Sequence, residues 1–367
     1  MNIYWFLFIA FLILAVQGWI YRRWSLSQLQ YSRKFSTPTC YRGDEILILE
    51  TISNRKLLPL PWLLLQSQFH TALQFQHQSN LDISKGQFYQ NHKSIFSLMP
   101  YTQIVRKHRI ICSKRGSYRL NTVSLTCGDA FGISKTYKTL PLDGQLLVFP
   151  KPIPMDEVPL PSRSWQGEVI VRRWILDDPF TVAGAREYRY GDTLNGINWK
   201  ATARNGMLQV HNRERTADHR VVIMVNFDLN ESVQTQISDP DTIEKALSYA
   251  ITIADWVISQ GMEIGFACNG YSEDAPKEPV FVEPRGGHEA LNELNYVMAK
   301  LVIAQSLGFE QFMANIIRNQ IVDTDIVLIS AYISNEIQLH IEHLQATGNI
   351  VTIVELQPDA LKSEVAN

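Results

Sequence analysis

The densest group of side chains able to bind a charged ligand lies between residues 186 and 215. Six cations and three anions fall there: Arg186, Arg189, Lys200, Arg204, Arg213 and Arg215 against Glu187, Asp192 and Glu214. Guanidinium groups pair with carboxylates and stack on aromatic rings such as Tyr188 or Trp199. The leading interpretation is an internal ion-pair and stacking network. The alternatives are an exposed dock for an acidic partner, and a phosphate or nucleic-acid site, for which a glycine-rich loop is missing.

A second candidate site follows the apolar run 220–227. The residues are Asp228-Leu-Asn230-Glu-Ser232. Loops at the carboxyl ends of parallel strands form the usual binding crevice of a sheet. One carboxylate with hydroxyl and carbonyl oxygens suits a hard cation such as Mg²⁺. The alternative is that Asp228 and Ser232 cap a turn or the start of a helix.

Other chemistry has little support in the sequence. The chain contains no G-x-S-x-G, no H-E-x-x-H and no Walker lysine motif. The histidines of the N-terminal half lack ligand spacing. The four cysteines, Cys40, Cys112, Cys127 and Cys268, form no C-x-x-C. We therefore expect separate reduced thiols and no zinc site.

The elements that would position these candidates alternate along the C-terminal half. Apolar runs at 220–227, 263–268, 325–330 and 350–355 predict strands, and helical spacing predicts helices at 242–260, 288–303, 308–319 and 335–346. Strands that alternate with helices predict an open, mostly parallel sheet with right-handed crossovers.

The preceding part of the chain has a different pattern. Short β-rich runs between residues 35 and 150 predict a β-sandwich-like domain of antiparallel strands. Residues 57–63 contain two prolines, which favours a loop or an edge strand. Prolines at 150, 152, 154, 159 and 161 then predict a linker that leads into the charged segment.

The N-terminus predicts a membrane anchor. Residues 3–20 carry no charge, and aromatic residues flank the run. Eighteen helical residues span about 27 Å, close to the thickness of the hydrocarbon core. Arg22 and Arg23 follow the run, so the positive-inside rule predicts a single pass with the bulk of the chain in the cytoplasm. The predicted domains are an anchor at 1–24, a β-sandwich-like domain at 35–150, a signature segment at 151–215 and an α/β domain at 216–360.

Length and charge exclude several classes. The 367 residues suffice for two or three domains with their own cores, without disulfides or metals. A net charge of −2 argues against a protein that coats nucleic acid, because such domains are strongly basic.

The charged segment resembles a known family signature. Residues 186–192 read REYRYGD and residues 197–204 read INWKATAR. They resemble the signature of the domain of unknown function 58 family, R-x-Y-x-x-G-D followed by I-D-W-K-x-x-A-R. The matching residues are Arg186, Tyr188, Gly191, Asp192, Trp199, Lys200, Ala203, Arg204 and Glu214. The chain departs at Asn195, where the family often carries Arg, and at Asn198, where it often carries Asp. The resemblance extends upstream through Arg115-Gly-Ser-Tyr118 and Asp129-Ala-Phe-Gly132 and covers most of the chain.

The resemblance implies a bacterial membrane-anchored partner of MoxR-type AAA+ ATPases with a von Willebrand factor A-like C-terminal domain. The metal site of such a domain resembles D-x-S-x-S, followed by an Asp after a later strand. Here Asn230 replaces the first Ser, and Ala331 stands where the later Asp is expected. With one carboxylate fewer, we expect no cofactor and no tight Mg²⁺ binding by Asp228, Asn230 and Ser232.

The leading hypothesis is a non-enzymatic, membrane-anchored interaction or scaffold protein. It would act with a MoxR-type ATPase and other membrane or envelope proteins in complex or envelope assembly, without nucleic acid. The alternative is a hydrolase or other enzyme that uses the Asp228 loop and an Asp192/Arg204 cluster.

Overall fold

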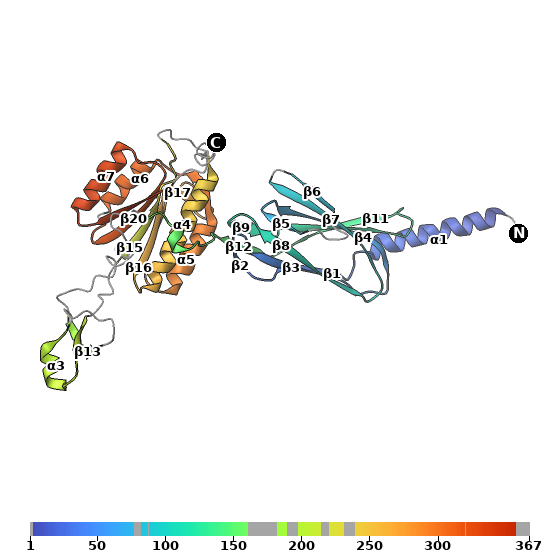
Figure 1. The fold of residues 1–367 in the computed structure, drawn as a ribbon. Coiled ribbons are helices and arrows are strands. Elements are labelled where there is room, and N and C mark those ends of the chain that lie inside the picture. The colour runs from blue at the N-terminus through green and yellow to red at the C-terminus, as the bar shows by residue number, and fades with distance from the viewer. Residues whose placement is uncertain are drawn as a thin grey trace, which may run out of the picture. The chain divides into compact units, whose positions relative to one another are not determined.

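The computed structural model describes residues 3–76, 82–86, 88–160, 182–188, 197–213, 220–230, 239–319 and 321–356. Figure 1 shows its helices and strands. The chain divides into two compact units, residues 1–151 with 298–300, and residues 152–297 with 301–367. The helix predicted to be a membrane anchor belongs to the first unit, and the signature segment belongs to the second.

The first unit begins with an apolar helix and continues in strands. Helix α1 spans Ile3–Trp24. The strands are β1 (Leu29–Phe35), β2 (Thr39–Tyr41), β3 (Glu45–Asn54), β4 (Leu60–His70), β5 (Leu73–Phe75), β6 (Asp82–Lys85), β7 (Tyr89–Leu98), β8 (Gln103–Cys112), β9 (Gly116–Arg119), β10 (Thr122–Gly128), β11 (Lys135–Pro141) and β12 (Gln145–Phe149).

These strands form two packed sheets and a small third one. The strand orders are β1-β3-β8-β5, β11-β10-β4-β7-β6 and β2-β12-β9. Ile52 of the first sheet and Leu63 and Val123 of the second share one hydrophobic cluster, so the two sheets form a sandwich. A second cluster holds Ile48, Ile110 and Phe69. Each apolar cluster is built from alternate residues of the strands, as the two-residue period of a strand requires.

The prediction of a loop or edge strand at residues 57–63 holds for residues 57–59 and is wrong for residues 60–63. Leu60 opens β4, which lies in the middle of the five-stranded sheet between β10 and β7. The β4–β7 pairing shifts register between Leu60 and Leu63. Pro61 lies at this irregularity, where a missing backbone N–H is tolerated.

The second unit contains a mostly parallel sheet. Its strands are β15 (Arg220–Val225), β16 (Glu263–Cys268), β18 (Val280–Arg285), β20 (Thr324–Ser330) and β21 (Ile350–Glu355), in the order β18-β16-β15-β20-β21. The pairings β16–β15, β15–β20 and β20–β21 are parallel, and β18 is antiparallel to β16. Elsewhere in the described residues, the pairings between named strands are antiparallel except β2–β12.

Helices cover both faces of this sheet. They are α4 (Pro240–Ser259), α5 (His288–Lys300), α6 (Phe309–Arg318) and α7 (Asn335–Ala346). Figure 1 shows α6 and α7 on one face and α4 and α5 on the other. Val222, Met224 and Leu328 pack against the α6–α7 side. The strand β15 is buried on both faces, which explains its continuous apolar sequence.

Several smaller elements differ from the predictions. The helix expected at 288–303 ends at Lys300, and β19 (Leu301–Gln305) follows and pairs with β17 (Gly270–Ser272). A single 3₁₀ turn, η1, lies at Met155–Glu157. The signature segment contributes β13 (Val182–Glu187), α3 (Trp199–Asn205) and β14 (Gln209–Arg213), and the helix α3 was not expected.

Candidate functional site

The Asp228 carboxylate lies just beyond the carboxyl end of β15 and accepts three hydrogen bonds. Its Oδ1 accepts from Asn269 Nδ2 and Gln305 Nε2, each at 2.7 Å. Its Oδ2 accepts from the backbone N–H of Phe309 at 2.8 Å, in the first turn of α6. Burial raises the pKa of Asp228, and the bonds from Phe309 and Asn269 oppose that rise. The carboxylate therefore joins three segments of the chain.

Asn226 and Asn269 extend this network beneath the loop. Asn226 Oδ1 accepts from the backbone N–H of Asp228 at 2.8 Å, and its Nδ2 donates to Ser330 Oγ at 3.0 Å. Asn269 Oδ1 accepts from the backbone N–H of Phe227 at 2.9 Å. Both asparagines are buried. The pattern matches the rule that buried polar groups are hydrogen-bonded, and it ties the ends of β15, β16 and β20 together.

This geometry is that of a structural hub more than of a cation site. The groups that face the Asp228 carboxylate are amide and backbone N–H donors. A Mg²⁺ site would need oxygen ligands in these positions. Asn230 is exposed, Ser232 lies outside the described residues, and Ala331 supplies no carboxylate. Within the described ranges, no group of three or more His, Cys, Asp or Glu side chains could hold a metal ion. The expectation of no tight Mg²⁺ binding stays a prediction, and this arrangement is consistent with it.

The described part of the signature segment is a pair of strands, β13 and β14, with α3 between them in sequence. The strands β13 and β14 pair antiparallel, and Ile197 bridges to Val210. Asn198 caps the helix, since its Oδ1 accepts from Ala201 N at 3.0 Å. Asn and Asp cap equally well, so the departure at position 198 keeps this role. Gly206 ends α3 with φ +69°, a left-handed conformation that favours glycine.

Among the described side chains of this segment, Ile197, Gln209 and Val210 are buried, whereas those of α3 are not. Trp199 is 68% exposed, and α3 has no buried residue. Lys200 and Arg204 are also exposed, whereas Tyr188 is half-buried. Gly191, Asp192 and Glu214 lie outside the described residues, as does the side chain of Arg186. The described part therefore brings Trp199, Lys200 and Arg204 together on one exposed helix.

A buried charged cluster in the β-sandwich was not foreseen from sequence. Glu50 is 1% exposed. Its Oε1 accepts from Arg33 at 2.5 Å and from the Tyr31 hydroxyl at 2.6 Å. His108 Nε2 lies 3.2 Å from Oε2, and Arg106 lies 3.6 Å from it. Burial raises the pKa of Glu50, but the His108 hydrogen bond, the Arg33 charge and the Tyr31 hydroxyl outweigh it and hold the pKa well below its usual range.

This cluster separates the two apolar clusters of the sandwich. Along β3, Ile48 belongs to one cluster and Ile52 to the other, with Glu50 between them on the same face. His92 of β7 lies nearby, with its ring 4.1 Å from that of Phe75. Burial, together with the Arg33 and His108 charges, lowers the pKa of His92 to about 4. The sequence spacing of these residues did not predict the buried charged cluster, because its members are far apart in the chain.

The cysteine prediction needs one correction. All four cysteines are free and buried. Cys40 and Cys112 are not separate, however, because their sulfur atoms lie 3.4 Å apart. Seventy-two positions separate them, and only the fold brings β2 beside the end of β8.

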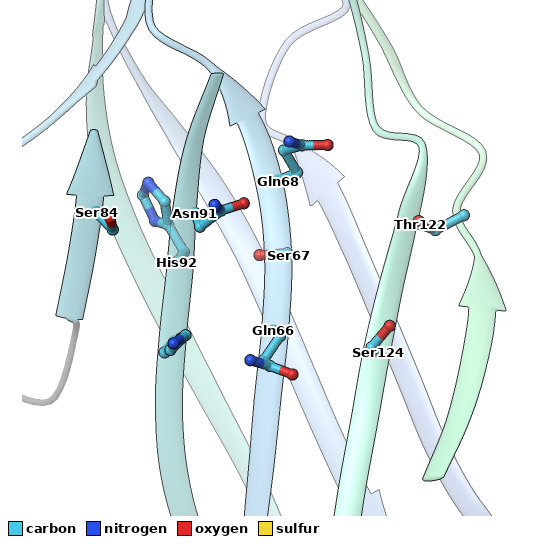
Figure 2. A pocket seen from close by; sticks show the side chains of 9 residues that line it. Gln66, Ser67, Gln68, Ser84, Asn91, His92, Thr122 and Ser124 are labelled. Carbon is cyan, nitrogen blue, oxygen red and sulfur yellow. The ribbon is translucent and has the colours of Figure 1, made fainter. Parts of the chain in front are cut away.

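Figure 2 shows a polar groove on the five-stranded sheet. Its volume is about 430 Å³. The lining side chains come from β4, β6, β7 and β10: Gln66, Ser67, Gln68, Ser84, Asn91, His92, Lys93, Thr122 and Ser124. The lining side chains offer mainly amide and hydroxyl groups for hydrogen bonds.

Comparison with known proteins gives a family match for the C-terminal part of the chain. Residues 184–359 match the family described as "Protein of unknown function DUF58". The family match begins near the charged signature and leaves out the upstream segments that also resembled the family. The chain is 20% identical over 267 residues to "Uncharacterized protein YeaD" of Bacillus subtilis (strain 168), covering 72% of this chain. The chain spans 62% of the length of that relative.

Solved structures give only local likeness. A non-cellulosomal cohesin from Archaeoglobus fulgidus is 12% identical, with 32% of this chain and 91% of that chain covered and a TM-score of 0.24. The ASH/PapD-like domain of human CEP192 is 12% identical, with 33% and 87% covered and a TM-score of 0.23. Similarity at this level carries no argument about function.

Proposed function

We propose that the chain is a membrane-anchored interaction protein that acts with a MoxR-type AAA+ ATPase in the assembly of protein complexes or of the envelope. Its C-terminal domain would be von Willebrand factor A-like. The parallel strands β16, β15, β20 and β21 between two helical layers support that assignment. The position of Asp228 at the end of β15 supports it as well.

The exposed α3 segment is the observation that carries the proposal. Trp199, Met207 and Leu208 are exposed apolar side chains on one short segment. Lys200 and Arg204 stand beside them as exposed cations. Exposed aromatic residues with neighbouring cations are typical of binding surfaces. The combination fits a partner surface that is acidic with an apolar centre.

Helix α1 supports the membrane part of the proposal. It has 22 residues, a mean hydropathy of 2.1 and no buried residue in its most apolar window. Its length of about 33 Å suffices to cross the hydrocarbon core. The two arginines of its last turn favour a cytoplasmic location for the rest of the chain.

The enzyme alternative has less support. The Asp228 carboxylate already accepts three hydrogen bonds from the protein, which leaves it poorly placed to act as a base. Asp192 lies outside the described residues.

The test is capture of the MoxR-type ATPase of the same genome by the full chain in crosslinked membranes. Trp199→Ala, and Lys200→Glu combined with Arg204→Glu, should each reduce capture several-fold. The matched controls are Leu339→Ala and Arg318→Glu, which change exposed residues of α7 and α6. Because Trp199 is exposed, its loss should leave stability nearly unchanged.

Two outcomes would contradict the proposal in different ways. If the α3 variants capture as much ATPase as the controls, α3 is not the dock. If the unmodified chain captures none, the ATPase is not the partner.

A further inference from the structure

The end of α1 is joined firmly to the β-sandwich. Tyr21 is buried, and a Cβ atom on Gly18 would come within 3.0 Å of Ser134 Oγ in the β10–β11 loop. The Lys56 ammonium donates to the backbone carbonyls of Ser25 at 2.5 Å and Ser27 at 2.9 Å, just past the helix. These contacts fix which end of the sandwich faces the helix.

Three turns of the sandwich meet at this end. Leu29, the first residue of β1, pairs with Asn54, the last residue of β3. Asn54 in turn binds the β7–β8 turn, since its Nδ2 donates to the Met99 carbonyl at 3.0 Å. The β10–β11 loop reaches Gly18 through Ser134. We call turns 55–59, 99–102 and 129–134, together with residues 18–27, the anchor end.

Each turn of the anchor end presents large apolar side chains to solvent. These side chains are between 64% and 75% exposed: Leu57, Met99, Tyr101, Phe131 and Ile133. Apolar side chains gathered at one end of a domain mark an interaction site. The turns at the opposite end are more polar, with Arg42, Asp44 and Lys114 at the β2–β3 and β8–β9 turns.

The exposed charges at the anchor end are all positive. Arg22, Arg23, Arg55 and Lys135 are exposed there. The acidic residue of the three turns, Asp129, is 1% exposed, and its Oδ1 accepts from the backbone N–H of Ser134 at 3.2 Å. Exposed apolar groups ringed by cations suit an anionic lipid surface.

The position of α1 in the membrane determines how deep the β10–β11 loop lies. Gly18 lies four residues before Arg22, or about 6 Å along the helix toward the apolar side. Ser134 lies against the helix at Gly18, so the end of the β10–β11 loop that follows Phe131 and Ile133 meets the helix within the apolar run, before its cations. The geometry points to a second membrane contact: the anchor end inserts the β10–β11 loop into the lipid headgroup layer. This inference rests on the proposed membrane anchoring by α1.

The experiment uses the full chain in vesicles of phosphatidylcholine and phosphatidylglycerol, with an environment-sensitive dye on a single introduced cysteine. The native cysteines are all buried, so the introduced thiol reacts selectively. Positions are Phe131→Cys and Ile133→Cys in the loop. Phe88→Cys is the matched control, since Phe88 is a 62% exposed phenylalanine immediately before β7, outside the anchor end. Phe11→Cys reports on α1.

The readout is quenching by lipids that carry a spin label near the headgroup or in the acyl chain. Dyes at 131 and 133 should be quenched several-fold more than the dye at 88, most strongly by the shallow label. Equal quenching at 131, 133 and 88, with strong quenching at 11, would overturn the loop contact and leave the anchor intact. Lack of quenching at 11 would overturn the anchor, and with it this inference.

Discussion

At the scale of single residues, Glu50 shows how a buried charge depends on its partners. The Arg33 and Glu50 side chains are 4% and 1% exposed, and Tyr31, His108 and Arg106 also contact the Glu50 carboxylate. A buried ion pair is weak proof of stability, because desolvation offsets much of the attraction. Removal of one partner is a different matter, since it leaves the other charge buried and unpaired.

Glu50→Ala should therefore destabilise the first unit by about 3–5 kcal/mol. The reporters are the buried thiols: Cys40, Cys112 and Cys127 lie in the first unit, and Cys268 lies in the second. Mass spectrometry gives the labelling midpoint of each cysteine, the urea concentration at which half of its thiol has reacted. The midpoints of Cys40, Cys112 and Cys127 should fall, and that of Cys268 should not change.

Glu45→Gln is the matched control for this change. Glu45 pairs with Arg109 at 3.7 Å on the surface, with side chains 45% and 65% exposed. Such pairs contribute at most about 1 kcal/mol. A Glu45 variant as damaging as the Glu50 variant would contradict the special role of the buried cluster.

His92 makes the first unit sensitive to mild acid. Its pKa is lowered from 6.5 to about 4 in the folded chain, by burial and by the Arg33 and His108 charges, with Glu50 opposing. Between about pH 4 and pH 6.5, the His92 imidazole is therefore protonated more readily in the unfolded chain than in the folded chain. The stability from neutral His92 is present above about pH 6.5 and is lost as the pH falls toward 4.

His92→Gln should flatten this dependence. When the pH is lowered from 7 to 5, the urea midpoint for Cys112 labelling should decrease in the unmodified chain. It should change less in the variant. Glu50 loses its charge only at lower pH, because its pKa is held below the usual range. Identical pH profiles in the two proteins would show that His92 does not titrate in this way.

At the scale of elements, the Asp228 hub holds the loop ends of the second sheet. Asp228→Asn removes the charge and turns an amide NH₂ toward existing donors, including Asn269 Nδ2 and the backbone N–H of Phe309. A buried donor left without an acceptor costs about 1–3 kcal/mol. The Cys268 labelling midpoint should drop accordingly, with Cys127 unaffected.

The same readout tests the metal prediction. With one carboxylate and three N–H donors around it, the hub should not respond to Mg²⁺ or to EDTA. A ligand that binds only the folded state raises its stability by mass action. An upward shift of the Cys268 midpoint with Mg²⁺ would show that the second unit binds the ion, and it would contradict this prediction.

Sequence patterns foresaw the regular elements and missed the features set by distant contacts. The strand Glu263–Cys268 and the helix Asn335–Ala346 match their predicted bounds, because each has a strong period and clear ends. The helix α3 was missed because only seven residues carry it. Its signals were Asn198 at the start and Asn205-Gly206 at the end. The Glu50 cluster and the Cys40–Cys112 contact arise from strand pairing, which local patterns do not specify.

At the scale of the whole molecule, α1 should decide where the chain resides. Deletion of residues 1–16 removes most of the apolar run and keeps Gly18 and Tyr21, which pack on the sandwich. The shortened chain should move to the soluble fraction with unchanged labelling of Cys127. The full chain should stay with membranes after carbonate washing.

A reporter fused after Asn367 checks the orientation. The positive-inside rule predicts activity only for a reporter that works in the cytoplasm. Activity of a periplasmic reporter would reverse the orientation. Retention of the shortened chain on washed membranes would show that the apolar part of α1 is not the sole anchor.

The charged layer of the sandwich also bears on how the chain avoids misfolding. Arg33, Glu50 and Arg106 stand in one row across β1, β3 and β8. Alternation of apolar and polar residues cannot distinguish two registers that differ by two positions, because both keep the same residues inside. A slip of two positions in β3 would set Ile48 or Ile52 between the arginines and carry Glu50 into an apolar cluster. Such a slip would leave three buried charges without their partners. The cluster therefore favours the native register over registers that bury the same apolar residues.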